Sequence, residues 1–498
     1  MKRLINLSLA ALSLLLAGTT AYAQPDSLWS VRFGSRNNDH ATAVYELDDG
    51  AFLIGCNAGN GYDWNASLLM FSPSGDSVWG RVYKAPRDEF VKTILPWFYG
   101  GYMLCGWSTS FSEGFPQFYM LCVDRQGTEL WKKTFGEDEC LTYTTVMDEN
   151  ADYYFLGTVN HRTEENGPRN FDARIMKISA TGDSLWTRDF GDQEHHEYMK
   201  KGIRTDDGGF AITGSIRSLD PDLDDRDVLL MKFDRYANLE WSRSYGTTID
   251  GEEGFALVQT PDGGYIVTGF YRSSERDNID GFALKFDAEG DSVWFRTVGT
   301  IRHDYIKAAN VTRDGNVILT GYSGYPGRNY DYKAINIDYL TGETIWEATF
   351  GGPYWDVCYN SKIMSDGSLI MLGESQTFTC DPNHLIPDSW VIKVGTPPSE
   401  VPVVKADDVV AQGISISGVT PNPFNSTAIV SVDLADRGAV EVTLTDLGGR
   451  TLRSWTVQNV VQGENRVKVD GSGLTTGTYW LSLKQNERTV SKKLTLLR

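Results

Sequence analysis

The sequence contains none of the short motifs that mark the common catalytic sites. It has no Gly-x-Ser-x-Gly nucleophile turn, no His-Glu-x-x-His zinc motif, no phosphate-binding loop and no Cys-x-x-Cys pair. No apolar run reaches the roughly 20 residues that a membrane-spanning helix needs. No long segment places apolar residues at helical spacing, which excludes helical bundles and helical solenoids.

Basic residues are scarce relative to acidic ones. The chain has 46 lysines and arginines against 66 aspartates and glutamates, a formal net charge of −20. This balance argues against nucleic acid or an anionic membrane as the main partner, because both repel an acidic surface. It fits a soluble extracellular protein whose surface attracts cations.

Cysteine is also infrequent, with six residues in 498. An exported chain can form disulfides, but six cysteines allow 15 pairings and spacing does not choose among them. Cys105 and Cys122 lie inside apolar, strand-like runs, which favours buried thiols over disulfides.

The N-terminus has the pattern of a secretory signal peptide, predicted to span residues 1–23. Lys2 and Arg3 precede an apolar stretch at residues 4–16, and small residues surround a cleavage point after Ala23. Thr19 stands where a lipoprotein would need cysteine, so we expect no lipid anchor.

Seven tryptophans recur roughly 50 to 55 residues apart, a period typical of repeat architectures. They are Trp29, Trp79, Trp131, Trp186, Trp241, Trp294 and Trp346. Each unit contains four short runs rich in β-branched and aromatic residues, separated by turn residues. We therefore expect a four-stranded antiparallel sheet in each unit, with tryptophan packing in the core. The turn between the first two strands is expected at Gly50, Gly100, Asn150, Gly208, Gly263, Gly315 and Gly367.

The two ends of the repeat region complement each other. Residues 27–34 read as a last strand without its first three, and residues 388–394 read as a third strand without a fourth. Their pairing would close a ring and remove exposed strand edges. The predicted fold is all-β: a seven-bladed β-propeller over residues 24–394, with its last blade closed by the N-terminal strand.

A polar linker is predicted at residues 395–412, followed by a small immunoglobulin-like β-sandwich at residues 413–498. This segment reads as about seven strands with alternating apolar positions such as Val440, Val442 and Leu444. It resembles the type A C-terminal sorting domain of the type IX (Por) secretion system. The residues that carry the resemblance include Pro421, Asn422, Pro423, Phe424, Asn425, Gly449 and Arg450. The resemblance implies the type IX machinery as a partner, and an extracellular or outer-surface location on a Gram-negative bacterium.

The repeats resemble the tryptophan-docking repeats of quinoprotein-like propellers, most closely at residues 338–346 (DYLTGETIW). Quinone-dependent dehydrogenases of that family usually have eight blades and adjacent cysteines beside the cofactor. This chain has neither feature in its sequence, so no quinone is predicted.

A carboxylate stands eleven residues before each expected turn residue, at the start of each first strand. The seven residues are Asp39, Glu89, Glu139, Glu197, Glu252, Asp304 and Asp356. We expect them to form a ring at one mouth of the central channel. Three roles stay open: accepting backbone N–H groups between blades, binding a cation such as calcium, or acting as a catalytic pair.

Other candidate residues lie on the loops of the same face. Aromatic residues there fit a glycan or protein ligand or ordinary loop packing; they are Tyr62, Trp64, Phe111, Tyr271, Tyr322, Tyr325 and Tyr330. An acidic loop at residues 220–227 departs from the EF-hand pattern at Asp225. His40, His195, His196 and His303 fall near this face, but their spacing does not require them to converge.

The sequence favours a secreted or surface-attached binding or scaffold protein without catalytic activity. The alternative is a secreted, carboxylate-dependent hydrolase or lyase acting on polysaccharide. No cofactor is predicted, apart from the calcium option at the carboxylate ring.

Overall fold

The computed structural model describes residues 27–34, 38–59, 63–112, 115–136, 138–162, 169–192, 194–218, 226–246, 251–273, 278–299, 302–324, 329–377, 387–395, 414–420, 427–434, 437–445, 450–461, 463–475, 477–485 and 488–496. The regular elements in these ranges are all β-strands, as the sequence predicts. None of the described segments is a helix long and apolar enough to cross a membrane. The chain divides into two compact units, Met1–Ser399 and Glu400–Arg498.

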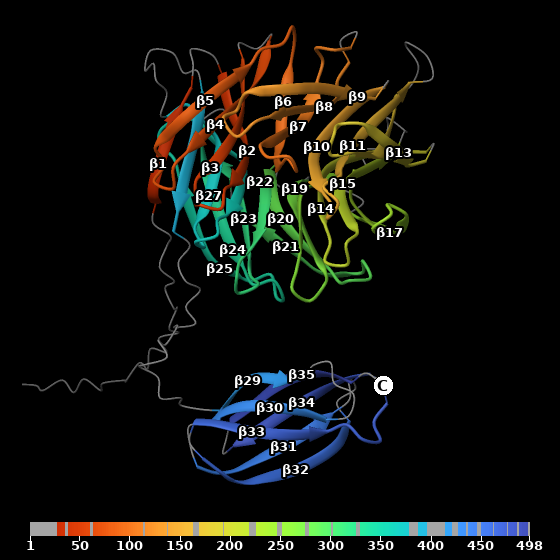
Figure 1. Ribbon diagram of the computed structural model, residues 1–498, viewed down its shortest axis with the longest axis vertical. Coiled ribbons are helices and arrows are strands. Elements are labelled where there is room, and N and C mark those ends of the chain that lie inside the picture. Colours follow the sequence, from red (N-terminus) through yellow and green to blue (C-terminus); the bar gives the residue numbers. More distant parts are fainter. Residues whose placement is uncertain are drawn as a thin grey trace, which may run out of the picture. The chain divides into compact units, whose positions relative to one another are not determined.

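The described strands of the first unit form seven four-stranded antiparallel sheets (Figure 1). Six sheets use four consecutive strands. The first three are β2 (Asn38–Glu46), β3 (Phe52–Gly59), β4 (Trp64–Phe71), β5 (Ser77–Tyr83); β6 (Glu89–Pro96), β7 (Tyr102–Ser108), β8 (Gln117–Val123), β9 (Glu129–Phe135); and β10 (Glu139–Met147), β11 (Tyr153–Arg162), β12 (Arg169–Ile178), β13 (Ser184–Phe190). The next three are β14 (His195–Arg204), β15 (Phe210–Ser218), β16 (Asp227–Phe233), β17 (Leu239–Tyr245); β18 (Gly251–Gln259), β19 (Tyr265–Ser273), β20 (Asn278–Phe286), β21 (Ser292–Val298); and β22 (His303–Val311), β23 (Val317–Gly324), β24 (Tyr330–Ile337), β25 (Thr344–Phe350).

The seventh sheet joins the two ends of this unit. Its strands are β26 (Asp356–Ile363), β27 (Leu369–Ser375), β28 (Asp388–Val394) and the N-terminal β1 (Ser27–Phe33). β1 pairs antiparallel with β28, so that Val31 lies opposite Val391. The pairing predicted between the two ends is therefore confirmed.

The first strand of each sheet contacts the first strand of the next, and β26 contacts β2. The sheets therefore follow one another in a closed ring, and these first strands line its centre. We call β2, β6, β10, β14, β18, β22 and β26 the inner strands. The third strands of the sheets are buried almost throughout, as in β16 and β28, because neighbouring sheets cover both of their faces.

The recurring tryptophans pack against the neighbouring sheet. A Cβ added at Gly127 would lie 2.6 Å from the Trp79 ring, and Gly127 has a φ of +75°. Glycine is required here because the turn needs a left-handed residue and the indole leaves no room for a side chain. The same contact recurs for Trp29 on Gly75, Trp131 on Gly182, Trp241 on Gly290 and Trp294 on Gly342. The tryptophans therefore stabilise the contacts between sheets.

The predicted turn residues hold at six of the seven first hairpins, where Gly50, Gly100, Gly208, Gly263, Gly315 and Gly367 have positive φ angles. The prediction for the third hairpin was wrong by one residue. Ala151, with a φ of 64°, is the left-handed residue there, and its N–H donates to the carbonyl of Asp148. Eleven residues separate Cys140 from Ala151, the same spacing as from strand start to turn in the other repeats, so the prediction had aligned the third repeat one residue early.

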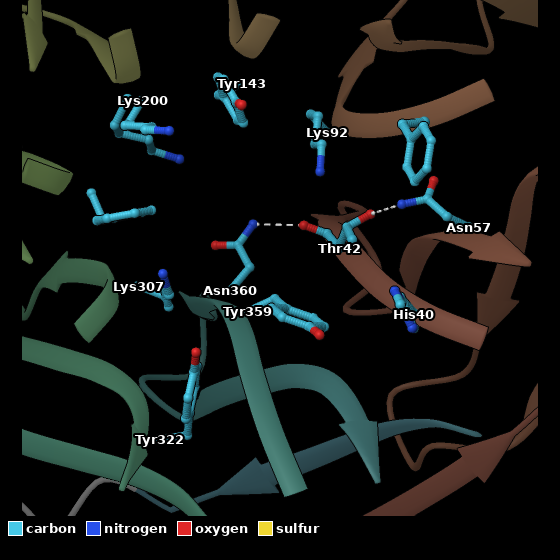
Figure 2. A pocket seen from close by; sticks show the side chains of 13 residues that line it. His40, Thr42, Asn57, Lys92, Tyr143, Lys200, Lys307, Tyr322, Tyr359 and Asn360 are labelled. Atoms are coloured by element: carbon cyan, nitrogen blue, oxygen red, sulfur yellow. Dashed lines mark hydrogen bonds between the residues drawn. The ribbon is translucent and has the colours of Figure 1, made fainter. Parts of the chain in front are cut away.

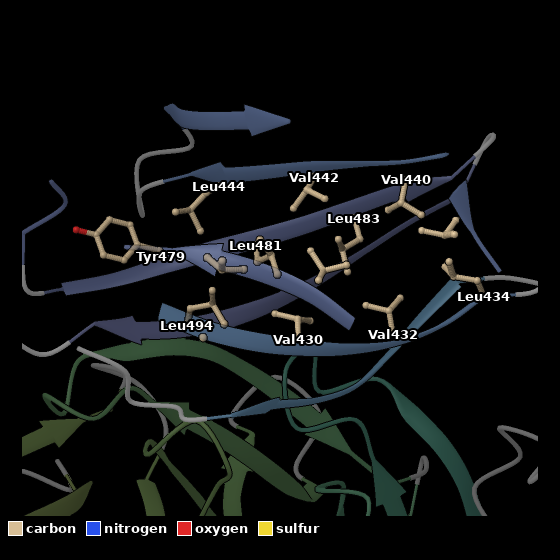
Figure 3. Close-up of a cluster of buried hydrophobic side chains, with 14 of the residues drawn as sticks. Val430, Val432, Leu434, Val440, Val442, Leu444, Tyr479, Leu481, Leu483 and Leu494 are labelled. Carbon is tan, nitrogen blue, oxygen red and sulfur yellow. The ribbon is translucent and has the colours of Figure 1, made fainter. Parts of the chain in front are cut away.

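The second unit contains two sheets. One is formed by β29 (Ile414–Thr420), β30 (Thr427–Leu434) and β33 (Gly463–Asp470); the other by β32 (Thr451–Val460), β31 (Gly438–Thr445), β34 (Gly477–Gln485) and β35 (Arg488–Leu496). Their apolar side chains share one core, which includes Val430, Leu481 and Leu494 (Figure 3). The alternation predicted for Val440, Val442 and Leu444 is confirmed, because all three are fully buried.

Five cysteines lie in the described part of the chain, and all five are buried free thiols: Cys56, Cys105, Cys122, Cys140 and Cys358. This agrees with the interpretation favoured from the sequence. Cys380 lies outside the described residues.

Candidate functional site

Each inner strand shifts register by one residue near its middle, leaving one residue unpaired with the second strand of its sheet. In β6, for example, Val91 pairs with Gly106 and Thr93 with Cys105, so Lys92 has no partner. Such β-bulges re-aim a side chain, and they are common beside binding sites. The seven residues, here called the bulge ring, are Thr42, Lys92, Tyr143, Lys200, Phe255, Lys307 and Tyr359.

In six of the seven sheets a glycine lies opposite the residue before the bulge and allows the two backbones to approach closely; in the first sheet Cys56 stands there. A Cβ at Gly106 would lie 1.7 Å from the carbonyl oxygen of Phe90, which no side chain tolerates. Neighbouring sheets then bond to the inner-strand backbone. The N–H of Val91 donates to Asn57 Oδ1 at 2.8 Å, and the hydroxyl of Thr42 donates to the carbonyl of Val91 at 2.7 Å. These contacts fix the position of the bulges relative to each other.

All seven bulge-ring side chains line one cavity of about 400 Å³. Figure 2 shows Lys92, Lys200 and Lys307 extending from different strands into the same central space. The other residues that line the cavity are His40, Asn57, Phe90, Lys201, Tyr322 and Asn360. The lining is therefore cationic and aromatic, although the chain as a whole is acidic.

Aromatic rings separate the three bulge-ring lysines. The ammonium of Lys200 lies 5.0 Å from the ring centre of Tyr143 and 5.4 Å from that of Phe255. Lys307 lies 3.6 Å from Phe255, and Lys92 lies 6.0 Å from Tyr143. Each ring thus lies between two lysines and offers its negative face to both.

No acidic residue lines this cavity, and within the described ranges none of these three lysines has an ion pair with a carboxylate. The pKa of Lys307 falls from 10.5 to about 7, because its ammonium is buried and because Lys200 repels it. The pKa of Lys92 falls to about 8, first because its ammonium is buried and then because Lys200 repels it. An anion entering the cavity would supply the charge that these lysines lack.

A second cavity of about 480 Å³ lies along the same inner strands. Lys92 and Lys201 line both cavities, and Lys362 and Arg204 line only the second. Burial lowers the pKa of Lys201, and the charge of Lys362 lowers it further. The cationic lining therefore continues along the channel.

The predicted carboxylates lie apart from the two cavities, since none of them lines either one. Six are buried at equivalent positions at the start of the inner strands: Asp39, Glu89, Glu197, Glu252, Asp304 and Asp356. In the third sheet the register differs from the predicted one. Cys140 occupies the equivalent position. It lies two residues before Thr142, which pairs with the glycine Gly157 on the second strand. Glu139 is one residue earlier, and its carboxylate accepts a hydrogen bond from Asn160 at 2.8 Å.

The hydrogen bonds of these carboxylates join strands and sheets. Asp356 accepts from the N–H of Gly352 and the hydroxyl of Thr377, each at 2.8 Å, and from the hydroxyl of Ser375. Glu89 accepts from Ser108 at 3.2 Å and from Ser110. This geometry fits the first of the three roles left open by the sequence, in which the carboxylates bind backbone and hydroxyl groups at sheet junctions.

Burial raises the pKa of three of these carboxylates. The pKa of Glu89 rises to about 7, against the lowering effect of its two serine partners. The pKa of Glu197 rises to about 8, first through burial and then through repulsion by Asp172 and Asp192. The pKa of Asp356 also rises, chiefly through burial.

The structure brings two of the other predicted residues to the cavity. Tyr322 lines it, and His40 lines it while its Nε2 lies 2.6 Å from Glu374 Oε2. Trp64 packs against His40 with tilted rings, whose centres lie 4.7 Å apart. Phe111 is exposed, and Tyr271 and Tyr330 pack against other aromatic rings. The predicted residues outside the described ranges are Tyr62, Tyr325, most of the 220–227 loop, Gly449 and Pro421, Asn422, Pro423, Phe424 and Asn425.

Reasoning from the sequence missed the bulge ring. Six of its members lie three residues after a predicted carboxylate, and the seventh, Tyr143, lies four after Glu139. The residue type varies around the ring, so no repeated letter marks the position. An alignment of the repeats to each other, read for the least uniform inner-strand position, would have pointed to it.

Residues 418–496 match the family described as "Secretion system C-terminal sorting domain". The resemblance inferred from the motifs is thereby confirmed, and the chain carries a Por-type sorting domain. Such a domain directs a protein to the cell surface or the extracellular space, where this protein is therefore located. No match to a curated protein was found.

Solved structures of low similarity include PorZ, an essential bacterial surface component of the type-IX secretion system of Porphyromonas gingivalis (10% identity, TM-score 0.42, 91% of this chain). The chain spans 59% of the length of PorZ. A europium-containing methanol dehydrogenase has 10% identity and a TM-score of 0.43, covering 75% of this chain and 93% of the enzyme. The polysaccharide lyase Uly1 has 12% identity and a TM-score of 0.47, covering 72% and 90%. With TM-scores below 0.5, these similarities assign neither an activity nor a ligand to this chain.

Proposed function

We propose that this protein is a binding protein at the cell surface or outside the cell, whose central cavity holds an acidic saccharide. Residues 24–394 form a seven-bladed β-propeller in this proposal. Residues 1–23 are a signal peptide, residues 395–412 a linker, and residues 413–498 an immunoglobulin-like domain that engages the type IX machinery. The closed order of the seven sheets supports the propeller, and the two packed sheets of the second unit support the sandwich.

The observation that carries the proposed ligand is the convergence of Lys92, Lys200 and Lys307 in a cavity without an acidic lining residue. A volume of about 400 Å³ lies in the range of small-molecule sites, which combine apolar walls with a few placed polar groups. Three cations select an anionic group, and the phenol hydroxyls of Tyr143 and Tyr322, which also line the cavity, add partners for sugar hydroxyls.

The geometry gives less support to a carboxylate-dependent hydrolase or lyase. Glycoside hydrolases typically need two carboxyl groups on either side of the scissile bond. The predicted carboxylates are instead committed to hydrogen bonds within the fold, as Asp356 shows with Gly352 and Thr377, and Glu89 with Ser108.

Calorimetric titration with an oligogalacturonate tests the proposal, with a neutral malto-oligosaccharide of the same length as the ligand control. The K92Q/K200Q/K307Q triple variant removes the three cavity charges, and Lys84→Gln, at an exposed lysine, is the matched protein control. We expect binding of the acidic sugar to wild type and to Lys84→Gln only. A sulfated oligosaccharide that binds in its place identifies the acidic group as sulfate. Equal binding of the neutral sugar, or binding of the acidic sugar that the triple substitution does not affect, refutes the proposal. Cleavage of the oligosaccharide in the same samples would support the enzymatic alternative instead.

A further inference from the structure

Three potential metal-ligand side chains meet where the β10–β13 sheet contacts the β14–β17 sheet. Asp192 lies in the connection between β13 and β14, and His195 and Glu197 lie at the start of β14. One ligand atom from each lies within 4.8 Å of the others. No other group of three such atoms this close occurs among the residues that the structure describes.

Glu197 is buried, with an exposed fraction of 3%, and its Oε2 has no hydrogen-bond partner. A buried carboxylate oxygen without a partner is costly, so native structures usually satisfy it with a donor or an ion. Hydrogen bonds within the group leave this oxygen unused. Asp192 instead accepts from the N–H groups of Glu194 and His195, and from His195 Nδ1 at 2.9 Å.

A fourth oxygen faces the same space from the neighbouring sheet. A Cβ added at Gly191 would lie 2.6 Å from Asp172 Oδ1 and 2.7 Å from Glu197 Oε2. The glycine therefore leaves a space between these two oxygens that any side chain would fill. Asp172 Oδ1 is also buried without a hydrogen-bond partner.

The opposite oxygen of Asp172 is held in place. Its Oδ2 lies 3.5 Å from His161 Nε2, and the same nitrogen lies 3.2 Å from Asp189 Oδ2. Such an outer partner fixes the orientation of a ligating carboxylate. Here it turns Oδ1 toward Gly191 and Glu197.

We propose that Asp172, Asp192, His195 and Glu197 bind one divalent transition metal ion of the zinc class. Three carboxylates and one imidazole supply four ligands, the number that Zn²⁺ takes in its tetrahedral sites. Ca²⁺ prefers six to eight oxygen ligands, so the imidazole nitrogen argues against it. Asp192, His195 and Glu197 already lie within 4.8 Å of one another, so closure around the ion requires Asp172 Oδ1 to move toward these three.

A second junction offers a matched control. Asp331 and Asp356 face Gly351 as Asp172 and Glu197 face Gly191, with their oxygens 2.2 and 2.8 Å from the place of a Cβ. There the N–H of Gly352 and the hydroxyl of Thr377 already occupy Asp356 Oδ2. We therefore expect no metal ion at the second junction.

The test is a Zn²⁺ titration of the chelator-treated full-length protein in competition with a chromophoric chelator. We expect one Zn²⁺ per chain, with affinity reduced at least tenfold in His195→Ala and in Glu197→Gln. Asp331→Asn should leave the affinity unchanged. His195 is partly exposed, so its variant keeps the proposal testable if Glu197→Gln does not fold.

Cobalt provides an independent readout, because its visible absorption reports coordination number and a nitrogen ligand. A tetrahedral Co²⁺ spectrum in wild type that is lost in His195→Ala supports the assignment. The proposal fails if no stoichiometric Zn²⁺ binds, or if His195→Ala binds as tightly as wild type. It also fails if Ca²⁺ displaces Zn²⁺ at equal concentration, since an all-oxygen site would then explain the binding.

Discussion

Two sets of residues lie a few positions apart on the same inner strands, and they differ in almost every respect. The carboxylates at the strand starts are nearly uniform in type, and six are buried at equivalent positions. The bulge ring varies from threonine to lysine, tyrosine and phenylalanine, and its members are half-buried around a cavity. The residue type is therefore nearly uniform where the side chain makes structural contacts, and it varies where the side chain faces the cavity that would hold a ligand.

The comparison predicts that a carboxylate substitution affects folding but not binding. Asp356→Ala leaves the N–H of Gly352 and the hydroxyls of Ser375 and Thr377 without their acceptor. We expect the free energy of unfolding to fall by about 3–5 kcal/mol, since each buried unsatisfied group costs about 1–3 kcal/mol. Chemical denaturation monitored by tryptophan fluorescence measures this loss. Affinity for the acidic sugar, measured on the folded fraction, should match wild type; a weakened affinity would place the carboxylate in the binding site.

The bulge ring should respond in the opposite way. The K92Q/K200Q/K307Q variant should lose at least about a hundredfold in affinity for an acidic saccharide, because charge-assisted contacts contribute about 1.5–3 kcal/mol each. Its unfolding free energy should not fall, because these lysines repel one another in the folded state. Calorimetry and denaturation on the same preparation check both statements. A marked loss of stability would make the bulge lysines structural.

Affinity for the anion should weaken as the pH rises. The pKa is about 7 for Lys307 and about 8 for Lys92, so both lose their charge in the free protein between pH 6 and pH 9. A bound anion favours the charged form, and binding must therefore take up protons over this range. We expect affinity to fall at least about tenfold from pH 6 to pH 9. Titrations in buffers of different ionisation enthalpy measure the proton uptake; a flat profile contradicts the lysine assignment.

The smallest effect concerns stability. The folded-state pKa of Lys307 lies below its usual value of 10.5, so the folded protein carries an unfavourable charge at low pH. This penalty is complete below pH 7 and disappears as the pH rises to 10.5, where the unfolded chain also loses the proton. Lys307→Met should therefore raise the free energy of unfolding by about 1 kcal/mol at pH 6, with the gain shrinking toward pH 10. Melting temperatures across this range test the sign; a gain that grows with pH would reverse it.

Much of the fold could be predicted because the same strand pattern, turn residues and tryptophan recur in each repeat. The spacing of Trp79 and its counterparts predicted the sheets, and the incomplete ends predicted the pairing of β1 with β28. The alternation at Val440 predicted the core of the second unit. The two errors in the third repeat share one cause, since the prediction aligned that repeat one residue early, at Glu139 and Asn150, where the structure places Cys140 and Ala151.

The candidate site could not be predicted in the same way. A β-bulge depends on the pairing between two strands. The residues around Lys92 or Phe255 do not by themselves indicate a one-residue shift in the register of that pairing. The net charge of −20 was also misleading locally, because it averages an acidic exterior with a cationic channel. The Zn²⁺ site needed coordinates as well, since Asp172 lies on a different sheet from Glu197.

The central claim is that the bulges direct Lys92, Lys200 and Lys307 into one anion-binding cavity. Crystals soaked in selenate test it most directly, because selenium gives an anomalous signal that locates the anion without a model of the ligand. The account predicts a selenium peak that places selenate oxygens within hydrogen-bonding distance of at least two of the three ammonium groups, and that is absent from the triple variant. Selenium peaks elsewhere on the protein, with no peak in the cavity, would contradict the account.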